Sequence, residues 1–123
     1  MAKVLLVEDT LELAQQACDI LRMEGHNVLI SLNGADALQL LRSGNLKPDV
    51  IITDLLMPGV DGFTLIEAVK NIPGLADTPI VIMSAKSDQD TVGRASSLGI
   101  KKFLAKPCSP EKLLQSIEAV IGD

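Results

Sequence analysis

Five polar residues lie at the carboxyl-terminal ends of short apolar runs, and their side chains could act together at one site. They are Glu8, Asp9, Asp54, Ser84 and Lys106. A single acidic residue after an apolar run is usually a solvated turn or a helix cap, so none of them is informative alone. Three carboxylates, one hydroxyl and one amine at equivalent positions are much harder to explain as a coincidence.

The three carboxylates have a chemical consequence if they lie close together. Two carboxylates about 5 Å apart repel by roughly 3 kcal/mol at an effective dielectric constant of about 20. Glu8, Asp9 and Asp54 would therefore disfavour one another's charged forms or require a cation. Because this set offers only oxygen ligands and leaves positions open for water, it favours Mg²⁺ over Ca²⁺. Lys106 would add a further positive charge.

A cation, an amine and a hydroxyl around one carboxylate form a pocket that suits a transferring phosphoryl group. Such chemistry depends on charge neutralisation and positioning more than on covalent assistance. Asp54 would be the nucleophile, because a carboxylate can carry a phosphoryl group as an acyl phosphate.

The elements that must position these residues alternate between strand and helix. Continuous apolar runs predict five strands, covered on both faces, at 4–7, 28–30, 50–52, 80–82 and 103–105. Apolar residues at helical spacing predict a helix after each strand. Five such pairs imply right-handed crossovers and a parallel α/β sheet with helices on both faces. In such sheets the chemistry lies beyond the carboxyl ends of the strands, where all five polar residues fall.

Helix boundaries are indicated by capping residues and by breakers. Asn33 and Asp61 are candidate N-caps, and Ser109-Pro110 places a cap before a proline at the first helical position. The segment 87–90 resembles a capping box that begins at Ser87. The helix after it contains Gly93 and has low propensity. Further breakers predict helix ends at Gly25, near Gly44 and at Pro73-Gly74.

In sequence order, the motifs resemble those of the receiver domain of two-component response regulators: Val7-Glu8-Asp9, Asp54-x-x-x-Pro58-x-x-Asp61-Gly62, Ser84-Ala85 and Lys106-Pro107. The resemblance covers essentially the whole chain. It implies a flavodoxin-like doubly wound five-stranded parallel sheet of order 2-1-3-4-5 in a single domain, 1–123. It also implies a phosphorylation-dependent signalling switch, not a metabolic enzyme. Asp54 would accept the phosphoryl group from a histidine kinase or histidine phosphotransfer protein.

The resemblance also implies a role for each residue near the metal. Asp9 and Asp54 would ligate Mg²⁺ directly, the backbone carbonyl of Leu56 would be a third protein ligand, and Glu8 would act through a metal-bound water. Lys106 would pair with Asp54 and then with a phosphoryl oxygen.

The remaining implied roles concern the switch. The Ser84 hydroxyl and the Ala85 backbone would bind phosphoryl oxygens, and Phe103 would turn inward when Ser84 moves. A plain core aromatic is the alternative for Phe103. Lys106-Pro107 would be a cis peptide bond. The face made by the fourth helix, fifth strand and fifth helix would then control an effector or a fused output domain.

Two departures from the family pattern affect these expectations. Leu56 is apolar and Lys86 is basic at positions that often tune the lifetime of the phosphoryl group, so we expect slow autodephosphorylation. Lys101 and Lys102 stand where transcription-factor receivers commonly carry an acidic residue before the fifth strand. The dimer contacts of that subclass are therefore doubtful, and we expect a monomer or a weak dimer.

Composition limits the remaining classes of function. The net charge of −5 argues against direct nucleic-acid binding. No signal peptide or membrane-spanning stretch is evident, so we expect a cytoplasmic protein without membrane contact. Cys18 and Cys108 lack metal-ligand spacing and should be inert thiols, although Cys108 could be accessible enough to oxidise. His26, the only histidine, is expected at the surface.

Two other classes of protein share some of these features. A haloacid-dehalogenase-like phosphatase also uses Asp and Mg²⁺, but its Asp-x-Asp motif follows the first strand. Here Asp54 follows the third predicted strand, and Leu56 occupies the position of the second Asp. A nucleotide- or flavin-binding module would need a glycine-rich phosphate loop, which the sequence lacks.

Overall fold

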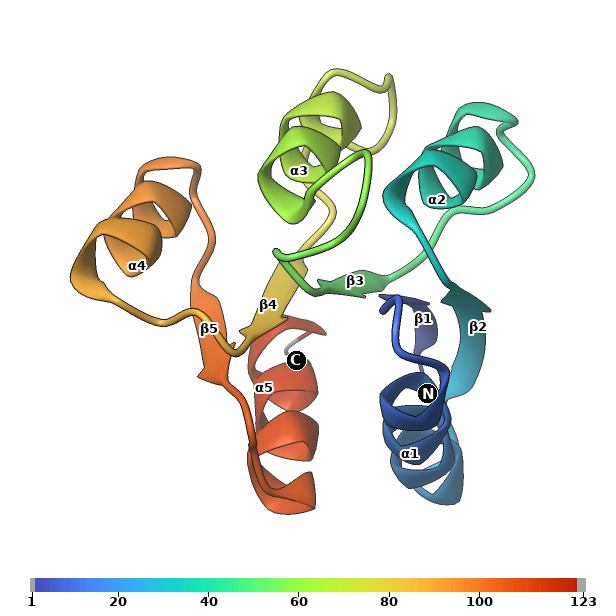
Figure 1. Ribbon diagram of the computed structural model, residues 1–123. Coiled ribbons are helices and arrows are strands. Elements are labelled where there is room, and N and C mark those ends of the chain that lie inside the picture. Colours follow the sequence, from blue (N-terminus) through green and yellow to red (C-terminus); the bar gives the residue numbers. More distant parts are fainter. Residues whose placement is uncertain (1, 122–123) are drawn as a thin grey trace.

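The computed structural model describes residues 2–121, in which five strands alternate with five helices (Figure 1). The elements, in chain order, are β1 (Lys3–Val7), α1 (Leu11–Met23), β2 (Asn27–Ser31), α2 (Gly34–Arg42), β3 (Val50–Thr53), α3 (Gly62–Lys70), β4 (Ile80–Ser84), α4 (Gln89–Ser97), β5 (Lys102–Ala105) and α5 (Pro110–Ile121). All five predicted strands and helices are present.

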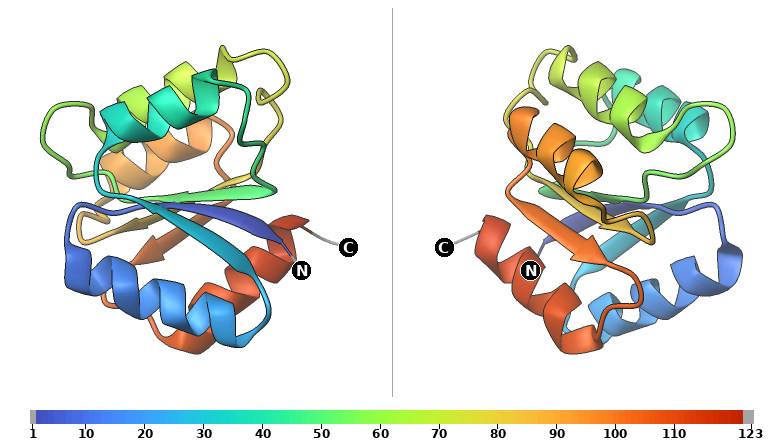
Figure 2. Two further views of the ribbon diagram at one scale, coloured as in Figure 1. Left: turned by 90° about the vertical axis from the view of Figure 1, so that its right-hand side faces the viewer. Right: turned by 60° about the vertical axis from the view of Figure 1, so that its left-hand side comes forward.

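The strands form one parallel sheet in the order β2-β1-β3-β4-β5. This confirms the predicted fold class. Helices α1 and α5 cover one face, and α2, α3 and α4 cover the other, so the sheet is the middle of three layers (Figure 2). The order reverses direction between β1 and β3, which creates the switch point at which ligands bind in such sheets.

The core consists of two apolar clusters, one on each side of the sheet. Along β1, Leu5 and Val7 pack toward α2 and α3, whereas Val4 and Leu6 pack toward α1 and α5. All four side chains are buried. Strands covered on both faces need apolar residues at every position, which explains the continuous apolar runs in the sequence.

The helix caps agree with the sequence in most places. The Asn33 side chain accepts a hydrogen bond from the Asp36 amide, and Asp61 accepts one from the Thr64 amide, as N-caps do. The Ser109 hydroxyl oxygen accepts a hydrogen bond from the Lys112 amide at the start of α5.

Two boundary predictions were wrong in detail. The N-cap of α4 is Asp88 and not Ser87, because the Asp88 carboxylate accepts hydrogen bonds from both the amide and the hydroxyl of Thr91. Those bonds also lower the pKa of Asp88. Helix α3 ends at Lys70, before the Pro73-Gly74 breaker, and the chain continues in a series of turns to β4.

The structure adds a hydrogen bond to the surface position expected for the histidine. His26 is only partly exposed, and its Nδ1 accepts a hydrogen bond of 3.1 Å from the backbone amide of Ala2. Cys18 is buried and Cys108 is half-buried. Across residues 2–121, no helix has the length and apolar character needed to cross a membrane.

Candidate functional site

The carboxyl ends of four strands deliver the five polar residues to one edge of the sheet. Glu8 and Asp9 follow β1, Asp54 follows β3, Ser84 ends β4 and Lys106 follows β5. Backbone hydrogen bonds continue the sheet into this edge: the Asp54 amide donates to the Val7 carbonyl at 3.0 Å, and the Lys106 amide donates to the Ser84 carbonyl at 2.8 Å. The Lys106-Pro107 peptide bond is cis, as the resemblance implied.

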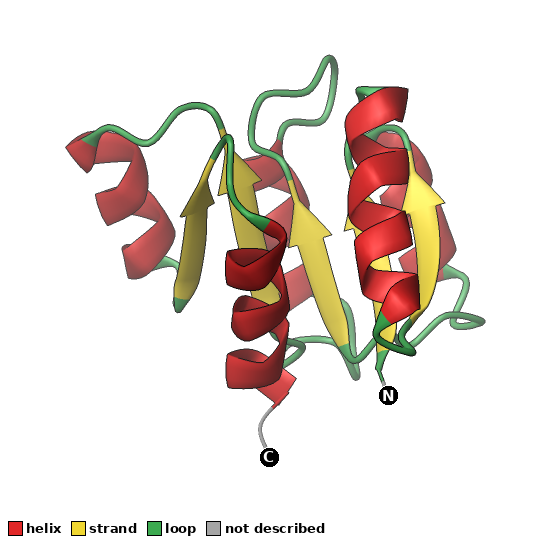
Figure 3. Ribbon diagram, turned by 90° about the horizontal axis from the view of Figure 1, so that it is seen from below, coloured by secondary structure: helices red, strands yellow, loops and turns green. Residues whose placement is uncertain are grey.

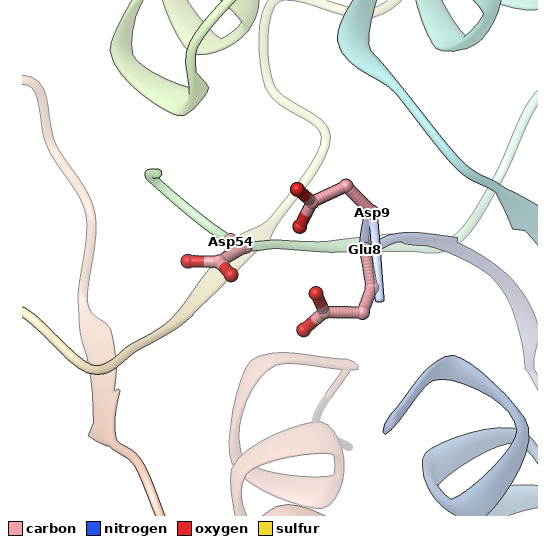
Figure 4. Close-up of side chains that lie close together, drawn as sticks. All are labelled: Glu8, Asp9 and Asp54. Carbon is pink, nitrogen blue, oxygen red and sulfur yellow. The ribbon is translucent and has the colours of Figure 1, made fainter. Parts of the chain in front are cut away.

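Three carboxylates meet at this edge (Figure 4). One oxygen atom from each of Glu8, Asp9 and Asp54 lies within 4.8 Å of the other two. Glu8 is fully buried, Asp54 is 6% exposed and Asp9 is exposed. The cluster is therefore sealed on the sheet side and open to solvent at Asp9.

Lys106 places its ammonium group between two of these carboxylates. Its Nζ donates to Oδ2 of Asp54 at 2.8 Å and to Oε1 of Glu8 at 2.5 Å. The Asp54 contact is the pairing that the resemblance implied. The Glu8 contact was not foreseen, because it joins residues 98 positions apart and no local pattern signals it.

The protonation of this group follows from the same contacts. Burial alone would lower the pKa of Lys106, but the hydrogen bonds and charges of Asp54 and Glu8 outweigh it and raise that pKa. Burial raises the pKa of Glu8, although the contacts with Lys106 and the Thr10 amide oppose the rise. A charged lysine thus offsets part of the repulsion among the carboxylates.

The backbone around Asp54 holds its carboxylate in place. Oδ1 accepts hydrogen bonds from the amides of Leu55, at 2.6 Å, and Leu56, at 3.3 Å. Behind this turn, the Gly62 amide donates to the Leu55 carbonyl at 3.0 Å. A Cβ atom on Gly62 would lie only 2.3 Å from the Asp54 carbonyl oxygen, so only glycine allows α3 to approach so closely.

The other predicted site residues lie at the same edge of the sheet. Ser84 is buried, and its hydroxyl oxygen accepts a hydrogen bond from the Lys86 amide at 3.1 Å. Ala85 and the Lys86 side chain are exposed beside it. Leu56 is 56% exposed, so its apolar side chain lies at the solvent-facing rim near Asp54.

Phe103 lies farther from the carboxylates. On β5 it pairs in register with Ile82, two residues before the Ser84–Ala105 pair at the site. Its half-buried side chain packs against the core cluster beneath α3 and α4. Both interpretations, core aromatic and switch residue, are compatible with this position.

Sheet, switch point and polar cluster together match one family. The sequence model of one protein family, the response regulator receiver domain, matches residues 4–118 of this chain. The chain belongs to this family, whose members act in two-component signalling as regulatory phosphoacceptor domains and not as a class of catalytic enzymes.

Relatives in sequence and structure agree with this assignment. The chain is 33% identical to protein PilH of Pseudomonas aeruginosa, with 99% of each chain covered. It is 35% identical to the probable transcriptional regulator ycf29 of Porphyra purpurea, which it covers over only 56% of that protein's length. The chemotaxis protein CheY4 of Vibrio cholerae superposes with a TM-score of 0.89 at 31% identity, and 98% of each chain is covered.

These matches also bear on the alternative hypothesis. The matches named here are response regulators, transcriptional regulators or chemotaxis proteins, and they give no support to a haloacid-dehalogenase-like phosphatase.

Proposed function

We propose that this chain is a phosphorylation-dependent switch in which Asp54 accepts a phosphoryl group from a histidine kinase or a histidine phosphotransfer protein. The observation that carries the proposal is the grouping of three carboxylates and one ammonium group around a nearly buried Asp54. Residues 1–123 would act as one receiver domain, either alone or within a longer regulator.

The transfer needs a correctly held carboxylate. One Asp54 oxygen attacks the phosphorus atom of the partner's phosphohistidine. The new O–P bond forms as the N–P bond breaks, and the bonding electrons return to the imidazole nitrogen. The amides of Leu55 and Leu56 orient Oδ1, and Lys106 orients Oδ2, which supports a fixed direction of attack.

The donor set fits a hard divalent cation, because it consists of three carboxylates with an open side at Asp9. Asp9, Asp54 and the backbone carbonyl of Leu56 would hold Mg²⁺, which would neutralise charge on the phosphoryl oxygens. Glu8 would contribute through a water. Both of its carboxylate oxygens already accept hydrogen bonds, from Lys106 and the Thr10 amide, which supports an indirect role.

The switch would begin with groups beside Asp54. The Lys106 ammonium group, which contacts the Asp54 carboxylate, then also binds a phosphoryl oxygen. The Ser84 hydroxyl and the Ala85 amide bind a second phosphoryl oxygen. Phe103 then turns inward behind Ser84. Phe103 on β5 pairs with Ile82 on β4, which is two residues before Ser84. This proximity supports the coupling.

The output surface would be the face formed by α4, β5 and α5, read by a separate effector or a fused output domain. Helix α4 has only Thr91 and Ala95 buried among its nine residues. A helix held by so few apolar contacts can shift at low cost, which suits a surface with two states.

The lifetime of the phosphorylated state would be set at the rim of the site. Leu56 cannot orient an attacking water, so autodephosphorylation is slow. The substitution Leu56→Asn therefore shortens the lifetime of the phosphoryl group. Exposed Lys86 is the second residue that tunes this lifetime. Loss of the phosphoryl group within seconds, or an unchanged lifetime in Leu56→Asn, would contradict this assignment.

The phosphoacceptor itself is tested with a small-molecule phosphodonor and Mg²⁺, followed by intact mass spectrometry. We expect a gain of one phosphoryl group that is labile at alkaline pH, absent without Mg²⁺ and absent in Asp54→Ala. Glu67→Gln, which changes an exposed carboxylate on α3, is the matched control and should be labelled normally. An equal gain of one phosphoryl group in Asp54→Ala, or no gain in the unsubstituted protein, would overturn the proposal.

A further inference from the structure

A lysine-lined hollow lies at the edge of the sheet opposite to Asp54. Its volume is about 360 Å³, and it lies where β4 and β5 begin. Figure 3 shows this edge, at which the strands start and the last turn of α5 lies, on the side away from the arrowheads. None of the three clustered carboxylates lines it, so the hollow is separate from the candidate phosphoacceptor site.

Three lysines from separate segments of the chain line the hollow. Lys70 ends α3, Lys101 lies in the loop after α4, and Lys102 begins β5. Among residues 2–121, Asp77 is the only carboxylate in the lining, so the described lining carries a net positive charge in a chain whose net charge is −5. Within residues 2–121, none of these three ammonium groups forms a salt bridge.

The Lys70 ammonium group lies beside Gly99, which also lines the hollow. Its Nζ lies 3.8 Å from the point that a Cβ atom on Gly99 would occupy. Gly99 also has a φ of +84°, which favours glycine and leaves that space open to the lysine. Lys70 and Lys102 are half-buried, so two of the three charges are partly removed from water and would gain from a bound counter-charge.

Apolar residues make up part of the lining beside these charged groups. Pro79 and Ile80 form one part of it, and Ile100 and Val120 form another. A ligand that fits must therefore combine a multiply charged anionic group with an apolar body. A phosphate dianion brings more negative charge and more acceptor oxygens to the three lysines than a single carboxylate does, and lysine is a common point-charge partner of phosphate.

We propose that this hollow is a binding site for a small organic phosphate, with the phosphate group among Lys70, Lys101 and Lys102 and the apolar body against Ile100 and Val120. Its volume lies within the range typical of small-molecule sites. This site does not depend on phosphorylation of Asp54 and would give the domain a second input.

Titration of ¹⁵N-labelled protein with AMP, monitored by amide chemical shifts, tests the proposal. EDTA is included so that the carboxylate cluster holds no cation, and about 0.15 M salt screens nonspecific contacts. We expect saturable shifts of the amides in segments 76–78 and 99–102. Adenosine, which lacks the phosphate, and inorganic phosphate, which lacks the apolar body, should each bind more weakly.

Two triple variants with equal changes of net charge separate a built site from general attraction. Lys70→Gln/Lys101→Gln/Lys102→Gln should raise the Kd for AMP by about tenfold or more. Lys3→Gln/Lys47→Gln/Lys112→Gln, which removes three lysines elsewhere, should leave it within about twofold. Because Lys101 is exposed, the single Lys101→Gln variant should fold and must by itself weaken binding.

Three results would overturn the proposal. They are the absence of saturable shifts, equal weakening in the two triple variants, and shifts confined to the edge that carries Asp54. Saturable binding of an acidic peptide at the same amides without binding of AMP would also reject a small-ligand site and indicate a protein partner.

Discussion

Arg94 on α4 places its guanidinium carbon 4.2 Å from the centroid of the Phe63 ring on α3. The same side chain has a nitrogen 3.8 Å from a carboxylate oxygen of Glu67, one turn farther along α3. Because only Thr91 and Ala95 of α4 are buried, this cation–π contact and ion pair form a polar tether for a weakly packed helix. Phe63 also directly follows Gly62, which packs against the backbone of Asp54.

Removal of this tether should loosen α4 more than it destabilises the whole domain. For Arg94→Ala we expect a loss of about 0.5–1 kcal/mol in the free energy of unfolding, because both charged partners are exposed. Hydrogen exchange of the α4 amides should become faster by more than the loss of global stability explains. Exchange in β1 and β3 should change only as much as the free energy of unfolding does. Arg42→Ala, on α2, is the control. Unchanged exchange in α4 would show that the contact carries no energy.

Two glycines should respond in opposite ways to the same substitution. Gly62→Ala would place a methyl group 2.3 Å from the Asp54 carbonyl oxygen and 2.7 Å from the Leu55 Cα, both backbone atoms. We expect it to cost about 2–3 kcal/mol in urea denaturation. Gly93→Ala, inside α4 with no atom within 4 Å, should stabilise by about 0.5–1 kcal/mol. A Gly62→Ala protein as stable as the wild type would refute the close approach.

Lys106→Met should destabilise the protein in metal-free buffer. The substitution leaves Glu8, whose side chain is fully buried, without its cationic partner, and such losses cost about 3 kcal/mol. The added variant Glu8→Gln should recover part of this loss, because a neutral amide carries no buried charge. Urea denaturation at pH 7 with EDTA measures both. If the double variant were less stable than Lys106→Met, unpaired charge would not be the cause.

The loss in Lys106→Met should also depend on pH. Without the lysine, the pKa of Glu8 should rise further above its value in the unfolded chain, because burial is then opposed by fewer favourable contacts. A carboxyl group with a raised pKa in the folded state stabilises folding below its unfolded pKa and loses that effect as the pH rises through the folded pKa. The difference from wild type should therefore shrink as the pH falls from 7 toward about 4.

Cys108 should react slowly with alkylating reagents near neutral pH. Burial raises the pKa of its thiol, although Lys106 and Lys112 oppose the shift, so less thiolate is present than in a free cysteine. The rate of reaction with iodoacetamide should reach half its maximum at a higher pH than for N-acetylcysteine. Cys108→Ser, which retains only buried Cys18, is the control. A half-maximal rate at the pH of the free thiol would contradict this prediction.

The sequence by itself determined the sheet, the strands and the edge at which the polar residues gather. These properties are local: apolar runs mark strands with two covered faces, Asn33 and Asp61 mark helix starts, and parallel connections bring strand ends together. The ordered motifs around Asp54 and Lys106 were sufficient to indicate the receiver family before any contact was known.

Tertiary structure alone decided which side chains meet across the sheet. The Glu8–Lys106 ion pair, the Arg94–Phe63 contact and the lysine-lined hollow join segments that no periodicity relates, because their distances depend on how helices and loops pack on the finished sheet. The identity of the N-cap of α4 was also decided by the folded backbone. Asp88 rather than Ser87 reached the free amide of Thr91, since the local backbone path and not the residue type decides which oxygen is in position.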